Sequence, residues 1–165
     1  MGGAGAIKAK APVFQKMAKA GLYTFVLTDL DSEECAATLI RNWFAIPKGQ
    51  FINLPIEVSF RVAVCEVESW IMADRDAFAQ FLGIAKVNFP LTPDDLLDPK
   101  QHLFNILRRK GLKKWHKEML PKGSSHIGPL YNEILCEFIV RKWSPMRAAK
   151  LSPSLKRAFV ALQRL

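Results

Sequence analysis

Apolar and polar positions along the first part of the chain predict a strand–helix–strand unit. Residues 23–28 and 58–65 are β-branched and aromatic runs that are apolar on both faces, which is typical of buried parallel strands. Between them, apolar residues recur at helical spacing over residues 33–46. Glu33 and Glu34 stand in the first turn of this expected helix, where the helix dipole favours acidic groups. The pattern therefore predicts a βαβ unit with two parallel strands.

The remaining pattern is helical. A short helix is predicted over residues 13–20, a long one over residues 66–83 and another over residues 127–143. Four further segments begin with a small polar residue followed by proline, which is the signature of a helix start. These segments are Thr92-Pro93, Asp98-Pro99, Ser144-Pro145 and Ser152-Pro153.

These elements predict an α/β chain whose two parts differ in charge. We expect a single domain over residues 1–165, with a small, mostly parallel sheet flanked by helices in residues 1–90 and a helical, basic part in residues 91–165. Residues 1–97 carry 9 basic and 11 acidic side chains, whereas residues 98–165 carry 15 basic and 4 acidic ones. The basic part indicates an anionic partner such as nucleic acid or an acidic membrane surface. The alternative is a surface that only keeps the protein in solution.

Composition excludes several classes of protein. Half of the residues are apolar, which excludes a disordered chain. The longest apolar stretches fall far short of the roughly 18 residues that a membrane span needs, and no signal peptide is recognised at the start. The three cysteines are far apart and lack zinc-binding spacing, so we expect buried, reduced thiols in a cytoplasmic protein.

Acidic residues follow both predicted strands. Asp29 and Asp31 end the first strand, and Glu66 and Glu68 follow the second. Because ligands bind outside the carboxyl ends of parallel strands, four carboxylates clustered there would suit Mg²⁺, which prefers oxygen ligands. In the alternative interpretation, the same residues are helix caps and acids of a first helical turn.

Two stretches that contain these acids resemble a known family. Residues 26–31, with Asp29 and Asp31, resemble the D-x-D motif of Toprim (topoisomerase–primase) domains. Residues 62–74 resemble the E-x-E-x-W-x-x-A-D segment of a Toprim-like bacterial family of undetermined function. Three more stretches match that family, namely Asp98-Pro99-Lys100, Gly128-Pro-Leu-Tyr-Asn132 and Ser152-Pro-Ser-Leu155.

The resemblance implies a Toprim-like sheet that binds Mg²⁺, or Mn²⁺ in its place, for phosphodiester chemistry. Asp29 and Asp31 would be the metal pair, and Glu68 and Glu66 would assist with the metal or a water molecule. Such relatives include nucleases, some of them in bacterial antiphage defence beside an ATPase partner. Toprim domains also have a catalytic glutamate on an earlier strand, and nothing before Tyr23 reads as that strand.

A basic stretch supplies candidate contacts for nucleic acid. Residues 108–117 contain six Lys or Arg side chains and Trp115, which is suited to stacking on a base. The candidate contacts are Lys100, Arg108, Arg109, Lys110, Lys113, Lys114, Trp115 and Lys117. The alternative is a solvated helix end, since cations gather at helix C-termini.

Three functions remain open from the sequence. The first is a Mg²⁺-dependent nuclease acting on DNA or RNA. The second is a catalytically degenerate module that binds nucleic acid through residues 108–117. The third is a subunit whose basic face docks onto a larger protein such as an ATPase.

Overall fold

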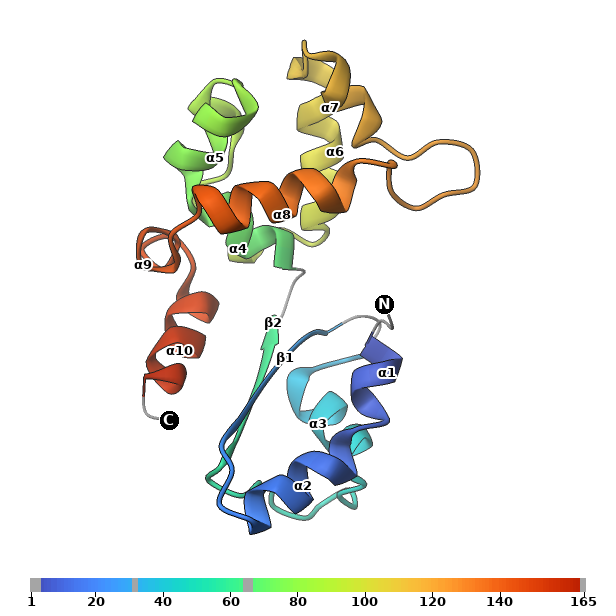
Figure 1. The fold of residues 1–165 in the computed structure, drawn as a ribbon, viewed down its shortest axis with the longest axis vertical. Helices are drawn as coiled ribbons and strands as arrows, with labels where there is room; N and C mark the ends of the chain where they lie inside the picture. Colours follow the sequence, from blue (N-terminus) through green and yellow to red (C-terminus); the bar gives the residue numbers. More distant parts are fainter. Residues whose placement is uncertain (1–3, 31–32, 64–66, 164–165) are drawn as a thin grey trace. The chain divides into compact units, whose positions relative to one another are not determined.

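The computed structural model describes residues 4–30, 33–63 and 67–163. The chain forms two compact units (Figure 1). One unit comprises Met1–Val64 with Arg157–Leu165, and the other comprises Cys65–Lys156. We call them the sheet unit and the helical unit. The division between them falls near residue 64, whereas the sequence placed the change from sheet to helical part near residue 90.

The sheet unit contains the expected βαβ arrangement. Strands β1 (Thr24–Asp29) and β2 (Val58–Ala63) pair in parallel, with Thr24 opposite Val58 and Asp29 opposite Ala63. Helix α3 (Ala36–Phe44) connects them. The predicted α/β class with a parallel strand pair flanked by helices is therefore confirmed.

Helices cover one face of this strand pair. Helices α1 (Ala4–Lys8) and α2 (Ala11–Lys19) precede β1, and α2 and α3 lie on the same side of the strands (Figure 1). Their core includes Val26, Trp43 and Phe60, and the rings of Trp43 and Phe60 meet edge to face at 5.1 Å. Burial of these large side chains is the main stabilisation of the unit.

Helix α3 is shorter than the sequence predicted. It begins after Cys35, so Glu33 lies outside the first turn, and the Glu33 carboxylate accepts a hydrogen bond from Asn42 Nδ2 at 3.0 Å. The helix ends at Phe44, and the next residue, Ala45, has a left-handed φ of 52° that turns the chain away. The Glu33 carboxylate thus binds a side chain of the helix instead of standing in its first turn.

All regular secondary structure among the described residues of the helical unit is helical. In chain order they are α4 (Val67–Ala73), α5 (Arg75–Leu82), the 3₁₀ helices η1 (Lys86–Asn88) and η2 (Pro93–Asp95), α6 (Pro99–Lys110), α7 (Lys114–Glu118), α8 (Tyr131–Arg141), α9 (Pro145–Ala148) and the start of α10 (Pro153–Leu162). Their common core is built around the fully buried Phe78, Leu103, Met119 and Phe138.

Two predicted helices are corrected. The expected continuous helix over residues 66–83 is broken at Asp74, whose carboxylate binds the backbone N–H of Ser144 and the guanidinium of Arg147. The helix expected over residues 127–143 begins only at Tyr131. Gly128 and Leu130 instead donate backbone hydrogen bonds to α7 and to Met119 just after it, and a Cβ at Gly128 would collide with that backbone.

The proline signatures predict the helix starts well. Asp98 caps α6 by accepting from Gln101 N at 2.7 Å, and Ser144 caps α9 in the same way. Ser152 accepts from Leu155 N at the start of α10. Thr92 precedes the short η2 without a side-chain cap. Local sequence therefore fixes these boundaries because both cap and proline act within one turn.

Two other expectations concern cysteines and membranes. Cys35 and Cys136 are exposed free thiols, so their expected burial is wrong, and Cys65 lies outside the described residues. Across residues 4–30, 33–63 and 67–163, no helix is long and apolar enough to cross a membrane.

Candidate acidic site and nucleic-acid interface

The carboxyl ends of the two strands meet at one edge of the sheet. Asp29 is the last residue of β1 and lies opposite Ala63, the last residue of β2, and the ladder continues as Leu30 N donates to Ala63 O at 3.1 Å. The half-buried Asp29 therefore stands where the sequence predicted it. Asp31 and Glu66, which follow the two strands in the sequence, lie outside the described residues.

Glu68 has a different environment from the one that the sequence predicted. It belongs to α4 of the helical unit, and its side chain is only 5% exposed. Its Oε1 accepts a hydrogen bond of 2.8 Å from the Tyr131 hydroxyl and lies 3.6 Å from Lys100 Nζ. Its carboxylate is thus already held by a phenol and an ammonium group, which compensate for its removal from water.

This arrangement bears on the expected metal site. Asp29 and Glu68 fall in different compact units, and the described residues contain no group of three or more His, Cys, Asp or Glu side chains that could hold a metal ion. Of the expected ligands, Asp29 is the described residue at the sheet edge. Glu68 lies in the other compact unit, and its Oε1 is engaged by Tyr131 and Lys100.

The contacts of Glu68 join stretches that are distant in the sequence. Glu68 lies in the E-x-E-x-W stretch, Lys100 in the Asp-Pro-Lys stretch and Tyr131 in the Gly-Pro-x-Tyr-Asn stretch. Trp70, two residues after Glu68, contacts the terminal Ser-Pro-Ser-Leu stretch, since its Nε1 donates to Ser154 Oγ at 2.7 Å. Lys100, predicted as a phosphate contact, therefore lies beside Glu68, and Tyr131 was not predicted to belong to the site. The only signal in the sequence for these contacts of Glu68 is that Lys100 and Tyr131 each belong to a stretch that resembles the same family.

A second polar network lies at the end of α4. The carboxylate of Asp74, which is 2% exposed, accepts from Arg147 Nε and Nη2 at 2.9 and 2.8 Å and from Ser144 N at 2.8 Å. The pKa of Arg147 is raised by its hydrogen bond to Asp74 and by the negative charge of that carboxylate, against a smaller opposing effect of desolvation. Asp74 therefore joins α4, α5 and α9.

The predicted basic stretch forms an exposed cationic surface on α6 and α7. We call the following six residues the basic cluster: Arg108, Arg109, Lys110, Lys113, Lys114 and Lys117. All six are exposed, and among the described residues no carboxylate lies within ion-pair distance of any of them. The guanidinium of Arg108 instead stacks over Phe104 at 5.9 Å. Their charges are therefore available to an anionic partner.

The turn between α6 and α7 is fixed by close packing. A Cβ at Gly111 would collide with the Leu107 carbonyl oxygen and with the Cβ of His116. His116 Nδ1 accepts from Lys113 N at 3.1 Å, so its other nitrogen carries the proton and donates to Leu82 O at 3.0 Å. Burial lowers the pKa of His116, the charge of Lys113 lowers it further, and the Leu82 hydrogen bond partly opposes both. A neutral histidine thus anchors the turn that carries the basic cluster.

Trp115, the predicted stacking residue, is only partly exposed. It is half-buried and packs against the core of the helical unit, with the Phe81 ring centroid 6.3 Å away. The ammonium of Lys113 lies 5.2 Å from the centroid of the Trp115 ring. Trp115 therefore packs between the core of the helical unit and Lys113 of the basic cluster.

Comparison with family models, with curated proteins and with solved structures gave no match for this chain.

Proposed function

We propose that the chain is a Mg²⁺-dependent phosphodiesterase that acts on DNA or RNA, with Mn²⁺ able to replace Mg²⁺. The parallel register of β1 and β2 is the observation that carries this proposal. It places Asp29 at the carboxyl edge of the strand pair, where open parallel sheets bind their ligands. The resemblance of the D-x-D stretch to Toprim domains gives further support.

The residues of the sheet edge suit a hard cation. Asp29 and Asp31 would hold the ion, and Glu66, which follows β2 in the sequence, is the remaining acidic candidate. A bound Mg²⁺ supplies electrostatic stabilisation of a phosphoryl oxygen and activation of a water molecule. The basic cluster would hold the strand through its phosphates, since its six cations have no carboxylate partners among the described residues.

A cleavage assay with a matched control tests this function. Single-stranded and duplex DNA and RNA are incubated with the protein in Mg²⁺, Mn²⁺ or a chelator. We expect cleavage that needs the metal and is lost in Asp29→Asn. Glu57→Gln changes an acid just before the start of β2, at the opposite edge of the same strand pair, and should retain activity. Absence of cleavage by the folded protein, or full activity of Asp29→Asn, would contradict the proposal.

A second candidate function is nucleic-acid binding without cleavage, by a subunit that works with a partner such as an ATPase. The enclosure of Glu68 favours it, because this acid is held by Tyr131 and Lys100 instead of being open to a metal. In this case the protein would bind oligonucleotides equally well with Mg²⁺ and with chelator and would leave them intact. Cleavage that disappears in Asp29→Asn would eliminate this candidate.

A further inference from the structure

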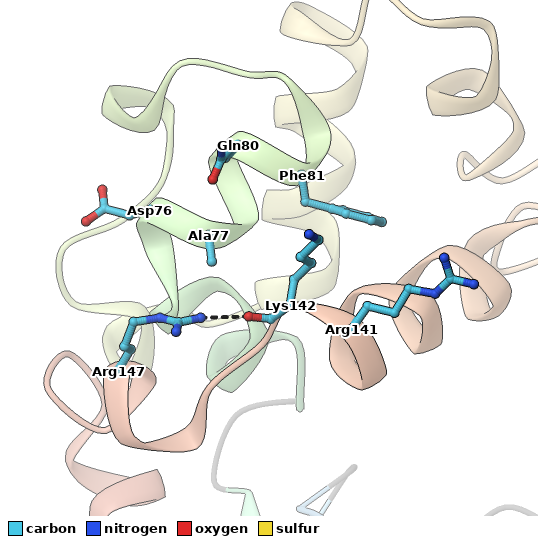
Figure 2. A pocket seen from close by; sticks show the side chains of 7 residues that line it. All are labelled: Asp76, Ala77, Gln80, Phe81, Arg141, Lys142 and Arg147. Carbon is cyan, nitrogen blue, oxygen red and sulfur yellow. Dashed lines mark hydrogen bonds between the residues drawn. The ribbon is translucent and has the colours of Figure 1, made fainter.

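A pocket lies between α5 and the turn that joins α8 to α9 (Figure 2). Its volume is about 560 Å³, within the usual range of small-molecule sites. Helix α5 contributes Asp76, Gln80 and Phe81, and the other wall contributes Arg141, Lys142 and Arg147. All of these residues belong to the helical unit, so the pocket is formed within one compact body.

The charged side chains around the pocket differ in how firmly other residues of the protein bind them. The carboxylate of Asp76 is paired with Lys86 Nζ at 2.7 Å, and Arg147 is bound to Asp74 and to the carbonyl of Lys142. Arg141 contacts Glu137 only at 3.5 Å, and both of these side chains are well exposed, so the pair is weak.

Lys142 is the cation that remains for a ligand. Within the part of the chain that the structure describes, no carboxylate lies at ion-pair distance from it. Its side chain extends from the end of α8 toward Phe81 (Figure 2). The pocket therefore offers one unneutralised ammonium group and, beside it, the weakly held guanidinium of Arg141 to an anion.

An aromatic ring stands beside these cations. The ring of Phe81 is half-buried, and its centroid lies 5.3 Å from that of Phe138 and 6.3 Å from that of Trp115. Trp115 also contacts the basic cluster, because the ammonium of Lys113 lies 5.2 Å from the centroid of the Trp115 ring. Gln80 is exposed on the same helix and supplies an amide that both donates and accepts hydrogen bonds.

We propose that this pocket binds a nucleotide, with the phosphate at Lys142 and Arg141 and the base against Phe81 and Gln80. A nucleotide matches this pocket because its phosphate is anionic and suits the two cations, whereas its flat base suits the aromatic ring and the amide. The nucleotide has two possible sources, a free nucleoside monophosphate or the terminal nucleotide of a strand held by the basic cluster. The second source rests on the function proposed above.

Binding of small probes to the full chain tests the pocket. Adenosine monophosphate, adenosine and inorganic phosphate are titrated into the protein by calorimetry in the presence of chelator. We expect the monophosphate to bind more tightly than either fragment and Lys142→Ala to weaken it by about tenfold, the effect of losing one charge-assisted contact. Lys150→Ala, an exposed lysine outside the pocket, should bind as the wild type does. No binding of the monophosphate, or equal binding by Lys142→Ala, would overturn the proposal.

A second arm separates the two sources of the nucleotide. A short oligonucleotide is compared with the same oligonucleotide carrying a 5′-phosphate. If a strand end is the ligand, the phosphate strengthens binding to the wild type but not to Lys142→Ala. If only the free monophosphate is affected by Lys142→Ala, the pocket takes a free nucleotide. Oligonucleotide binding without monophosphate binding would reject the pocket alone, whereas the reverse would reject the basic cluster as a nucleic-acid interface.

Discussion

At the scale of single residues, the unusual feature is a buried carboxylate with two polar partners. Glu68 is almost fully enclosed in the helical unit, and a charge in such a place is costly unless hydrogen bonds and an opposite charge compensate for it. Tyr131 and Lys100 provide both. We infer that this trio stabilises the helical unit, whatever chemistry takes place at the sheet edge.

The hydroxyl of Tyr131 provides the first prediction. Tyr131→Phe removes the donor to Glu68 and leaves a buried oxygen with one fewer partner, so the free energy of unfolding should fall by about 1–3 kcal/mol. Tyr23→Phe is the matched control, because Tyr23 is 57% exposed. Urea denaturation measures both variants, and equal stability of the two would contradict the assigned role of this hydrogen bond.

His116 provides a prediction about pH. Burial holds its pKa below 6.5, so protons bind the unfolded chain first as the pH falls through 6.5. The contribution of His116 to the free energy of unfolding is therefore fully present above this pH. It declines as the pH falls from 6.5 to the lower pKa of His116 in the folded protein. We expect His116→Gln to lose this decline and His126→Gln, an exposed histidine, to keep it. Unfolding free energies measured over a pH series would contradict the account if the two variants behaved alike.

At the scale of elements, α4 is the centre of the helical unit. It is a helix of 7 residues, too short to be stable alone, and so is α9 with 4 residues. Each is held by side chains from other elements. Glu68 binds Tyr131 of α8, Trp70 binds Ser154 of α10, and Asp74 joins α4 to α9 through Arg147.

Asp74 is the residue on which this arrangement of short helices depends. Asp74→Ala removes the acceptor for Ser144 N and for Arg147, so we expect loss of stability and less protection of the α9 amides from hydrogen exchange. Asp76→Ala removes an exposed carboxylate two residues away and should leave both unchanged. Unchanged exchange of the α9 amides in Asp74→Ala would show that α9 is held by other contacts.

The same elements show which features were predictable from sequence. Helix starts at Asp98, Ser144 and Ser152 were predicted because cap and proline act within a single turn. The parallel pairing of β1 and β2 was predicted because both strands are apolar runs separated by a helix. The helix break at Asp74 was missed, and the partner that its carboxylate binds there, Arg147, lies 73 residues away in the sequence.

The candidate site was predictable only in part for the same reason. The position of Asp29 follows from the end of a strand, which local sequence shows. The environment of Glu68 depends on Tyr131, 63 residues further along, and no local pattern reveals such a contact. The exposure of the basic cluster was predictable because six cations in ten residues cannot be buried without partners.

At the scale of the whole molecule, charge is concentrated in one region of the chain. The sequence carries a net charge of +9, and the basic cluster is an exposed, carboxylate-free part of it among the described residues. Such a surface attracts polyanions and releases their counterions on binding. Contact with nucleic acid through this cluster is the central claim of the account, and both candidate functions depend on it.

The salt dependence of binding tests this claim most directly. Affinity for a labelled single-stranded oligonucleotide is measured by fluorescence anisotropy in chelator over a series of salt concentrations. Six phosphate contacts predict a slope of about −4 for log K against log salt, from roughly −0.7 per contact. The triple variant Arg109→Ala/Lys110→Ala/Lys114→Ala should halve this slope to about −2. The control Lys10→Ala/Lys16→Ala/Lys19→Ala, which removes three exposed cations of the sheet unit, should retain it. A flat dependence on salt, or equal slopes for the two triple variants, would contradict nucleic-acid binding by the basic cluster.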